Sequence, residues 1–259
     1  DSLTSITVDK NNPVYHSAGN CIIETATKTL VVGCGASVIP SDGSVTSIGD
    51  YAFTGCKSLT SVTIGNGVTF KEASWKYITG EALVLSGETA KYTTYATLAD
   101  ALAAAQADDV VLLAKDATAT VVTVPTGVTL DLNGNTLTGP DDGKANWYAF
   151  IVDGGDLTLT DSTGEGQLYA KCYGVETKSG SFTLESGSIV ATKNQTVGTA
   201  IVNYGGAVFM EGGSISGADY AMYTAGYFSD AATAITGGTI EGVVGMGDYT
   251  DKAFTESVT

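Results

Sequence analysis

Apolar residues recur at fixed intervals over the C-terminal part of the chain. The sequence LNGNTL at residues 132–137 aligns with LESGSI at 184–189, MEGGSI at 210–215 and ITGGTI at 235–240. Leu159 falls between the first two segments, with four extra residues before Leu168, so the interval is 25 to 27 residues. A further apolar column stands nine residues ahead, at Phe150, Val175 and Ile201, and continues at Met222. Each unit of about 25 residues therefore predicts three short strands separated by turns.

Stacking of successive units explains this regularity. An antiparallel sandwich also has short, evenly spaced strands, but it does not require apolar residues at the same positions in every unit. In a parallel β-helix, equivalent residues of successive units lie about 4.8 Å apart and line one continuous core. Residues 92–259 resemble the right-handed parallel β-helix of the pectate-lyase-like superfamily, and the hand of the coil is what this resemblance implies.

Residues 97–106 (TLADALAAAQ) have the pattern of a helix. Thr97 and Asp100 have the spacing of an N-terminal capping box, and Leu98, Leu102 and Ala105 form a narrow apolar stripe. The open end of a coil exposes unpaired backbone groups that need a cover. We expect this helix to cover the N-terminal end of the coil; a helix that binds a partner is the alternative.

A second repeat, of different period, occupies the N-terminus. LTSITV at residues 3–8 recurs as LTSVTI at 59–64, and a full unit spans residues 44–64. The stretch VTSIGDYAFTGCKSLTSVTI resembles the BspA-type leucine-rich repeat of bacterial surface proteins, and residues 12–34 resemble a hairpin-forming insertion found in such arrays. The predicted fold is mainly β: short leucine-rich repeats over 1–70, a connector over 71–91, and a right-handed parallel β-helix with its N-terminal capping helix over 92–259.

The charge balance excludes several classes of partner. The chain has 12 lysines, no arginine and 28 acidic residues, which gives a formal net charge of −16. Nucleic-acid binding needs a basic stripe, and an anionic membrane surface repels such a chain. No apolar run approaches the 18–20 or so residues of a spanning helix. The chain begins at Asp1 without an initiator methionine, so we expect a processed protein or a part of a longer one, continuing beyond Thr259.

The cysteines do not have the spacing of a metal site. Cys21, Cys34, Cys56 and Cys172 form no CxxC pair, and His16 is the only histidine. Free thiols buried in the core of a repeat are the favoured interpretation. A disulfide between Cys34 and Cys56 is the alternative.

The enzyme hypothesis finds few residues to support it. Lyases of the β-helix superfamily typically abstract a sugar proton with a basic residue, commonly arginine, near calcium held by aspartates. This chain has no arginine, and no run of carboxylates brackets Lys171, Lys178 or Lys193. Asp141 and Asp142 are the paired aspartates of a glycoside-hydrolase hypothesis, but they lie between Pro140 and Gly143, which is typical of a solvated turn. We predict that the protein is not an enzyme and needs no cofactor.

Tyrosines give the stronger indication of a site. Tyr148, Tyr173 and Tyr220 each stand two residues before a residue of the Phe150 column, which predicts one vertical stack. Together with Tyr223 and Tyr227 they form the candidate ligand-binding set, a platform for sugar rings or a protein ligand. A purely structural aromatic ladder is the alternative.

Glu185 and Glu211 occupy equivalent, outward positions in consecutive units. A solvated surface is the simpler interpretation of this pair. A weak calcium site shared with another side chain is the alternative.

These features predict a secreted or cell-surface bacterial binding protein. Two tandem solenoids give long rigid faces suited to extended ligands, and BspA-type repeats imply adhesion to host matrix proteins, other cells or glycans. The alternatives are a carbohydrate-active lyase or hydrolase and a passive surface stalk. The partner, the anchor and the oligomeric state do not follow from the sequence.

Overall fold

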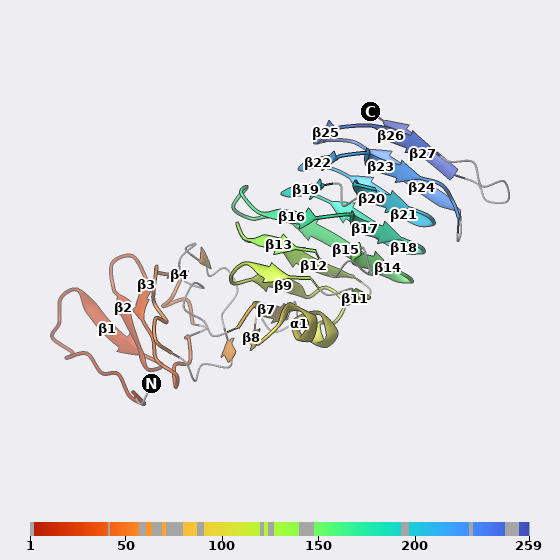
Figure 1. Cartoon of the computed structure of the whole chain (residues 1–259). Coiled ribbons are helices and arrows are strands. Elements are labelled where there is room, and N and C mark those ends of the chain that lie inside the picture. The colour runs from red at the N-terminus through yellow and green to blue at the C-terminus, as the bar shows by residue number, and fades with distance from the viewer. Residues whose placement is uncertain are drawn as a thin grey trace.

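The computed structural model describes residues 3–40, 42–56, 61–63, 69–70, 80–86, 91–119, 122–123, 127–139, 148–192, 197–227, 230–246 and 254–258. The main secondary structure is β-strand, and the larger part of the chain is a parallel β-solenoid, as the repeat predicts. In Figure 1 the strands stack in sequence order along the coil, from α1 to the C-terminus. The hand of the coil stays a prediction.

Three sheets form the walls of the coil. The strands of sheet 1 that run parallel are β9 (Val110–Leu113), β12 (Val128–Asp131), β15 (Gly155–Thr160), β18 (Gly180–Leu184), β21 (Gly206–Met210), β24 (Ala231–Ile235) and β27 (Phe254–Val258). Sheet 2 comprises β10 (Ala117–Thr118), β13 (Thr136–Thr138), β16 (Gln167–Ala170), β19 (Ser188–Ala191), β22 (Ser214–Gly217) and β25 (Thr239–Glu241). Sheet 3 comprises β11 (Val122–Thr123), β14 (Tyr148–Val152), β17 (Tyr173–Thr177), β20 (Thr199–Asn203), β23 (Tyr220–Thr224) and β26 (Val244–Met246).

The register of these sheets confirms most of the predicted columns. In sheet 2 the aligned core residues are Leu137, Leu168, Ile189, Ile215 and Ile240. In sheet 3 they are Phe150, Val175, Ile201 and Met222. All of these except Ile240 are fully buried and belong to one core cluster, so each rung covers the apolar side chains of the next.

One column prediction is wrong by two residues. Leu159 pairs with Leu130 of β12, whereas the repeat pattern placed Leu132 beside it. The turn after β12 holds Asn133 and Gly134 in left-handed conformations, with φ of 49° and 75°. This turn uses two more residues than the turns after β18, β21 and β24, and Leu132 is buried in the core without pairing in the strand.

Helix α1 (Leu98–Ala104) begins where the capping box predicted and ends two residues earlier than the pattern suggested. The Thr97 hydroxyl accepts the Asp100 N–H at 3.1 Å and donates to the Asp100 carboxylate at 2.7 Å. Leu98, Leu102 and Ala105 are buried in the core of the coil, as the apolar stripe predicts. The helix contacts β9 and two strands ahead of it, β7 (Ala82–Ser86) and β8 (Lys91–Tyr95).

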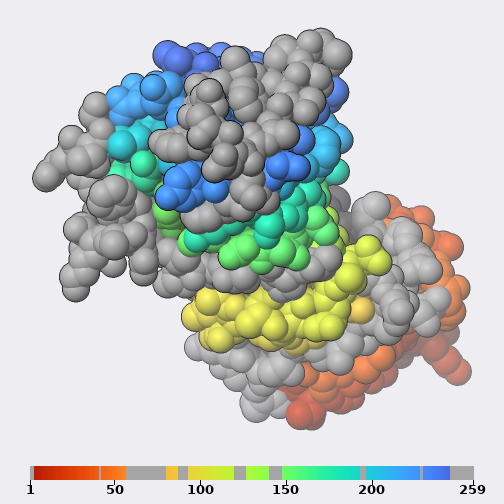
Figure 2. All heavy atoms as spheres, turned by 90° about the vertical axis from the view of Figure 1, so that its right-hand side faces the viewer, coloured from red at the N-terminus to blue at the C-terminus, as the bar shows by residue number. Residues whose placement is uncertain are grey.

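Strand β7 joins the coil to the N-terminal part of the chain. It pairs antiparallel with β9 and β8, and β8 pairs antiparallel with β5 (Ser61–Thr63). Because side chains alternate along a strand, Ala82 and Val84 face the core of the coil while Leu83 and Leu85 pack in a second core. Sheet 1 thus extends into the segment predicted as a connector, and Figure 2 shows the N-terminal part (red and orange) beside the first strands of the coil (yellow).

The N-terminal part contains the expected hairpin. Strands β1 (Tyr15–Ala18), β2 (Cys21–Glu24) and β3 (Thr29–Val32) are antiparallel neighbours, followed by β4 (Ser47–Ile48) and β6 (Thr69–Phe70) in parallel. Strand β5 lies inside the repeat unit of residues 44–64, and it pairs in sheet 1. The assignment of this part to leucine-rich repeats stays a prediction.

The four cysteines are buried free thiols, as the favoured interpretation predicted. Three of them, Cys21, Cys34 and Cys56, belong to the N-terminal part, where Cys21 and Cys56 pack in the second core. No helix among the described residues is long and apolar enough to cross a membrane.

Candidate ligand-binding site

The outer surface of sheet 3 carries the tyrosines predicted as a site. Tyr148 of β14 pairs in register with Tyr173 of β17, and their rings stack with centroids 4.6 Å apart and planes 19° apart. Both side chains are half-buried and lie outside the core cluster. This part of the predicted stack forms as expected.

The stack does not continue to Tyr220. Thr199 of β20 pairs with Tyr173 on one side and with Tyr220 on the other. A threonine rung therefore separates the two, and the prediction of one continuous vertical stack is wrong. Tyr220 instead lies against Tyr223 of its own strand, with ring centroids 5.4 Å apart.

Tyr204 extends the group formed by Tyr220 and Tyr223, a role that the sequence analysis missed. It follows β20, and its ring lies 6.3 Å from that of Tyr223 in an edge-to-face arrangement and 6.0 Å from that of Tyr227. It also lies close enough to Tyr148 to act electrostatically on its hydroxyl. We call these two groups of rings together the tyrosine patch, which comprises Tyr148, Tyr173, Tyr204, Tyr220, Tyr223 and Tyr227. Tyr227 is its most exposed member, at 56%.

A glutamate lies among these rings. Glu176 of β17 aligns with Ile151 on β14 and with Val202 on β20, so both neighbours in its column are apolar. Glu176 is only 3% exposed, and neither it nor Val202 belongs to the core cluster. The carboxylate is therefore buried on the outer side of the sheet, beneath side chains of the patch and of the turn after β17.

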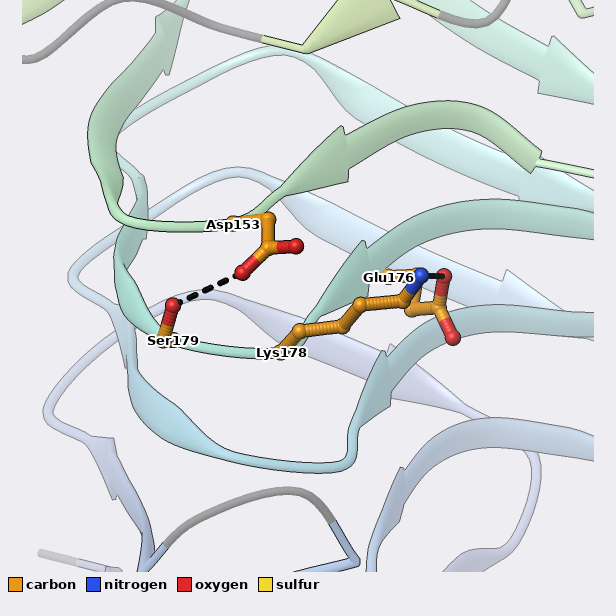
Figure 3. A network of polar contacts seen from close by, with 4 residues as sticks. All are labelled: Asp153, Glu176, Lys178 and Ser179. Atoms are coloured by element: carbon orange, nitrogen blue, oxygen red, sulfur yellow. Dashed lines mark hydrogen bonds and ion pairs between the residues drawn. The ribbon is translucent and has the colours of Figure 1, made fainter.

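Two groups of opposite character hold the Glu176 carboxylate. The Tyr148 hydroxyl donates a hydrogen bond to it. Lys178 reaches back from the turn, and its Nζ lies 3.5 Å from Oε2, as Figure 3 shows. That distance makes an ion pair but a poor hydrogen bond, and Oε2 has no hydrogen-bond partner. One oxygen of a buried carboxylate is thus incompletely satisfied.

Burial dominates the acid–base properties of this group. It raises the pKa of Glu176 above the ordinary value of a glutamate, against the opposing effects of Lys178 and of the Tyr148 hydrogen bond. Burial also raises the pKa of Tyr148 and of Tyr173, and the neighbouring Glu176 adds to both shifts. The tyrosines remain neutral hydrogen-bond donors at physiological pH.

Further polar groups lie at the margins of the patch. Ser179 donates to Asp153 across adjacent rungs at 2.9 Å, beside the Lys178–Glu176 pair (Figure 3). At another margin, Val197, Asp219, Tyr220 and Val243 line an open hollow of about 390 Å³. The patch therefore combines flat ring faces, a recess and charged groups, which is a surface suited to binding rather than to assembly of the core.

Glu185 and Glu211 occupy consecutive rungs just after the paired residues Leu184 and Met210, and both are exposed. Within the described part of the chain, no group of three or more histidine, cysteine, aspartate or glutamate side chains could hold a metal ion. Calcium binding by this pair with another ligand stays a prediction, and the absence of heat on titration with millimolar calcium would exclude it.

The other candidates for catalysis are partly outside what the structure describes. Asp141, Asp142 and Lys193 lie outside the described residues. Lys178 does lie beside a carboxylate, Glu176, which the sequence analysis did not pair with it. Two residues apart on an extended segment, their side chains leave on the same face, so spacing alone could have indicated the contact.

Comparison of the chain with family models, with curated proteins and with solved structures gave no match.

Proposed function

We propose that this protein is a non-catalytic binding protein whose ligand docks on the tyrosine patch. The observation that carries the proposal is two groups of tyrosine rings that lie outside the core cluster: Tyr148 with Tyr173, and Tyr204 with Tyr220, Tyr223 and Tyr227. Tyrosine supplies a large, rigid contact area with a polar end at little cost in side-chain entropy. A stacked solenoid holds these rings on a rigid support, which limits the ordering that binding requires.

The setting that we propose is the outer surface of a bacterial cell. The acidic composition, the β-solenoid and the predicted leucine-rich repeats support a secreted or surface-attached adhesin, with a matrix protein, a cell-surface protein or a glycan as partner. The BspA-type and pectate-lyase-like resemblances and the right-handed coil belong to this proposal. So does a covering role for α1 at the N-terminal end of the coil, which the burial of Leu98 and Leu102 supports.

Retention of the chain on an array of matrix proteins and polysaccharides, at two salt concentrations, tests the proposal. The wild type is compared with Tyr204→Ala, which removes the ring that contacts both Tyr223 and Tyr227, and with Tyr15→Ala, a control at an exposed tyrosine of the N-terminal part. We expect selective retention that falls on the order of tenfold or more in Tyr204→Ala and is unchanged in Tyr15→Ala. Equal retention of all three chains would contradict the proposal and favour the passive stalk.

A carbohydrate-active enzyme is the second candidate, favoured by the position of Lys178 beside Glu176. It predicts that a retained polysaccharide is cleaved with time and that Lys178→Ala, or a change at Asp141 or Asp142, abolishes product release. The binding proposal predicts a constant signal and no products from any of these chains.

A further inference from the structure

The Glu176 carboxylate is costly where it lies. An ionised group buried among apolar neighbours loses hydration, and one incompletely satisfied oxygen adds to that loss. An apolar residue in line with Ile151 and Val202 would continue the column without this cost. The carboxylate is therefore the feature of the patch that packing does not explain.

The surroundings of Glu176 are suited to a positive charge. Ring faces of tyrosine attract cations electrostatically, and Tyr148 and Tyr173 lie near the carboxylate. The cation now beside Oε2 is Lys178, which reaches it by a long flexible side chain and is 28% exposed. Lys178 is thus the cation with which the cation of a ligand would compete for Oε2.

The net charge of the whole chain also favours a cationic ligand. A net charge of −16 concentrates cations near the surface and repels acidic glycans. A neutral sugar stacks on tyrosine rings and donates hydroxyl hydrogen bonds to a carboxylate, but it brings no charge to balance that of a buried one. A basic side chain brings both the hydrogen bond and the charge.

We propose that the tyrosine patch recognises an arginine or lysine side chain of a partner protein, whose cation takes the place of Lys178 beside Glu176. This inference rests on the proposed binding function and names the chemistry of its ligand. The cation of the partner's side chain donates to Oε2 the hydrogen bond that this oxygen lacks, while the tyrosine rings flank the aliphatic part of the same side chain.

Calorimetric titration with a short peptide that carries one arginine, and with the same peptide carrying the neutral isostere citrulline, tests this inference. We expect the wild type to bind the arginine peptide and not the citrulline peptide. Glu176→Gln should weaken arginine binding on the order of tenfold or more, because the buried charge is lost while the shape is kept. Glu211→Gln, which removes an equal charge from an exposed site, should leave binding nearly unchanged.

The opposite change gives an independent readout. Lys178→Ala removes the internal competitor for Glu176 and should tighten binding of the arginine peptide. Lys115→Ala, which removes an exposed lysine, is the control for the change in net charge and should have a smaller effect. Equal affinity for the two peptides, equal loss in both glutamine variants, or weaker binding in Lys178→Ala would overturn the inference. Retention of a neutral glycan that Tyr204→Ala abolishes and Glu176→Gln does not would also overturn it, while the proposed binding function would stand.

Discussion

Asp161 links two rungs of the coil, and its removal gives a sharp test of how the turns are stabilised. Asp161 follows β15 and is only 6% exposed. Its Oδ1 accepts the N–H of Gly134, in the turn of the preceding rung, and its Oδ2 accepts the N–H of Gly166 in its own turn, both at 2.7 Å. Asp131 acts in the other direction, since it accepts the N–H of Ser162 at 3.0 Å.

The expected cost of Asp161→Ala follows from these two bonds. Gly166 is buried, so its N–H would lose its acceptor without replacement, at about 1–3 kcal/mol. Gly134 is exposed and can bond to water instead, so the loss there is about 0.5–1.5 kcal/mol. Together they predict a destabilisation of roughly 2–4 kcal/mol. Asp161→Asn keeps one acceptor oxygen and should cost about half as much.

The pH dependence provides a second readout at the same residue. Burial acts to raise the pKa of Asp161, but the N–H donors of Gly134, Gly166 and Gly164 outweigh it and lower the pKa below the ordinary aspartate value. A lowered pKa contributes stability that is present above the unfolded value and is lost as pH falls through the folded one. The difference in stability between wild type and Asp161→Asn should therefore narrow in acid.

Urea unfolding followed by circular dichroism measures these differences. Glu165→Gln is the matched control, because Glu165 is an exposed carboxylate in the same turn and should change stability by less than about 0.5 kcal/mol. If Asp161→Ala and the control unfolded at the same urea concentration, or if the difference grew in acid, the account of this turn would be refuted.

Three further changes test other parts of the structure. Gly180 has φ of 80°, and a Cβ there would collide with the carbonyl oxygen of Gly155, so Gly180→Ala should lower the free energy of unfolding by more than about 2 kcal/mol in urea unfolding. Gly154 has a similar φ of 82° but open space around a Cβ, so Gly154→Ala should lower it by only about 1 kcal/mol. Burial raises the pKa of Glu176 against the effects of Lys178 and Tyr148, so the wild type should lose stability relative to Glu176→Gln as pH rises through that pKa. If the difference in free energy of unfolding between the two chains stayed constant between pH 4 and 8, the raised pKa would be contradicted. Burial also raises the pKa of Cys21 and Cys56, so these thiols should react with a disulfide reagent far more slowly in the folded chain than in urea, and equal rates would argue against their burial.

The architecture of the coil could be predicted because its signal is repeated. A column such as Leu137, Leu168, Ile189 and Ile215 places an apolar residue at the same point of successive rungs. A wrong alignment of one rung therefore disagrees with the alignment of its neighbours. The shift at Leu132 arose where this redundancy ends, at the first of the aligned segments. There the left-handed turn at Asn133 and Gly134 decides the register, and hydrophobic pattern carries no information on its length.

The site could be predicted only in part. Pairing of Tyr148 with Tyr173 follows from equal spacing to the core column, and the same count would have shown Thr199 interrupting the stack. The position of Glu176 between Ile151 and Val202 could also have been predicted, because each of the three follows a residue of the Phe150 column. The contacts of Tyr204 could not have been predicted, because they depend on how rings from different rungs and turns pack together in space.

Hydrogen exchange of the chain, alone and with the ligand retained on the array, tests the central claim most directly. The account predicts slower exchange in β17, β20 and β23 and in the segment from Tyr220 to Tyr227, with β16, β19 and β22 of the neighbouring sheet unchanged. Protection confined to the N-terminal part or to sheet 2 would place the binding surface elsewhere and contradict the account.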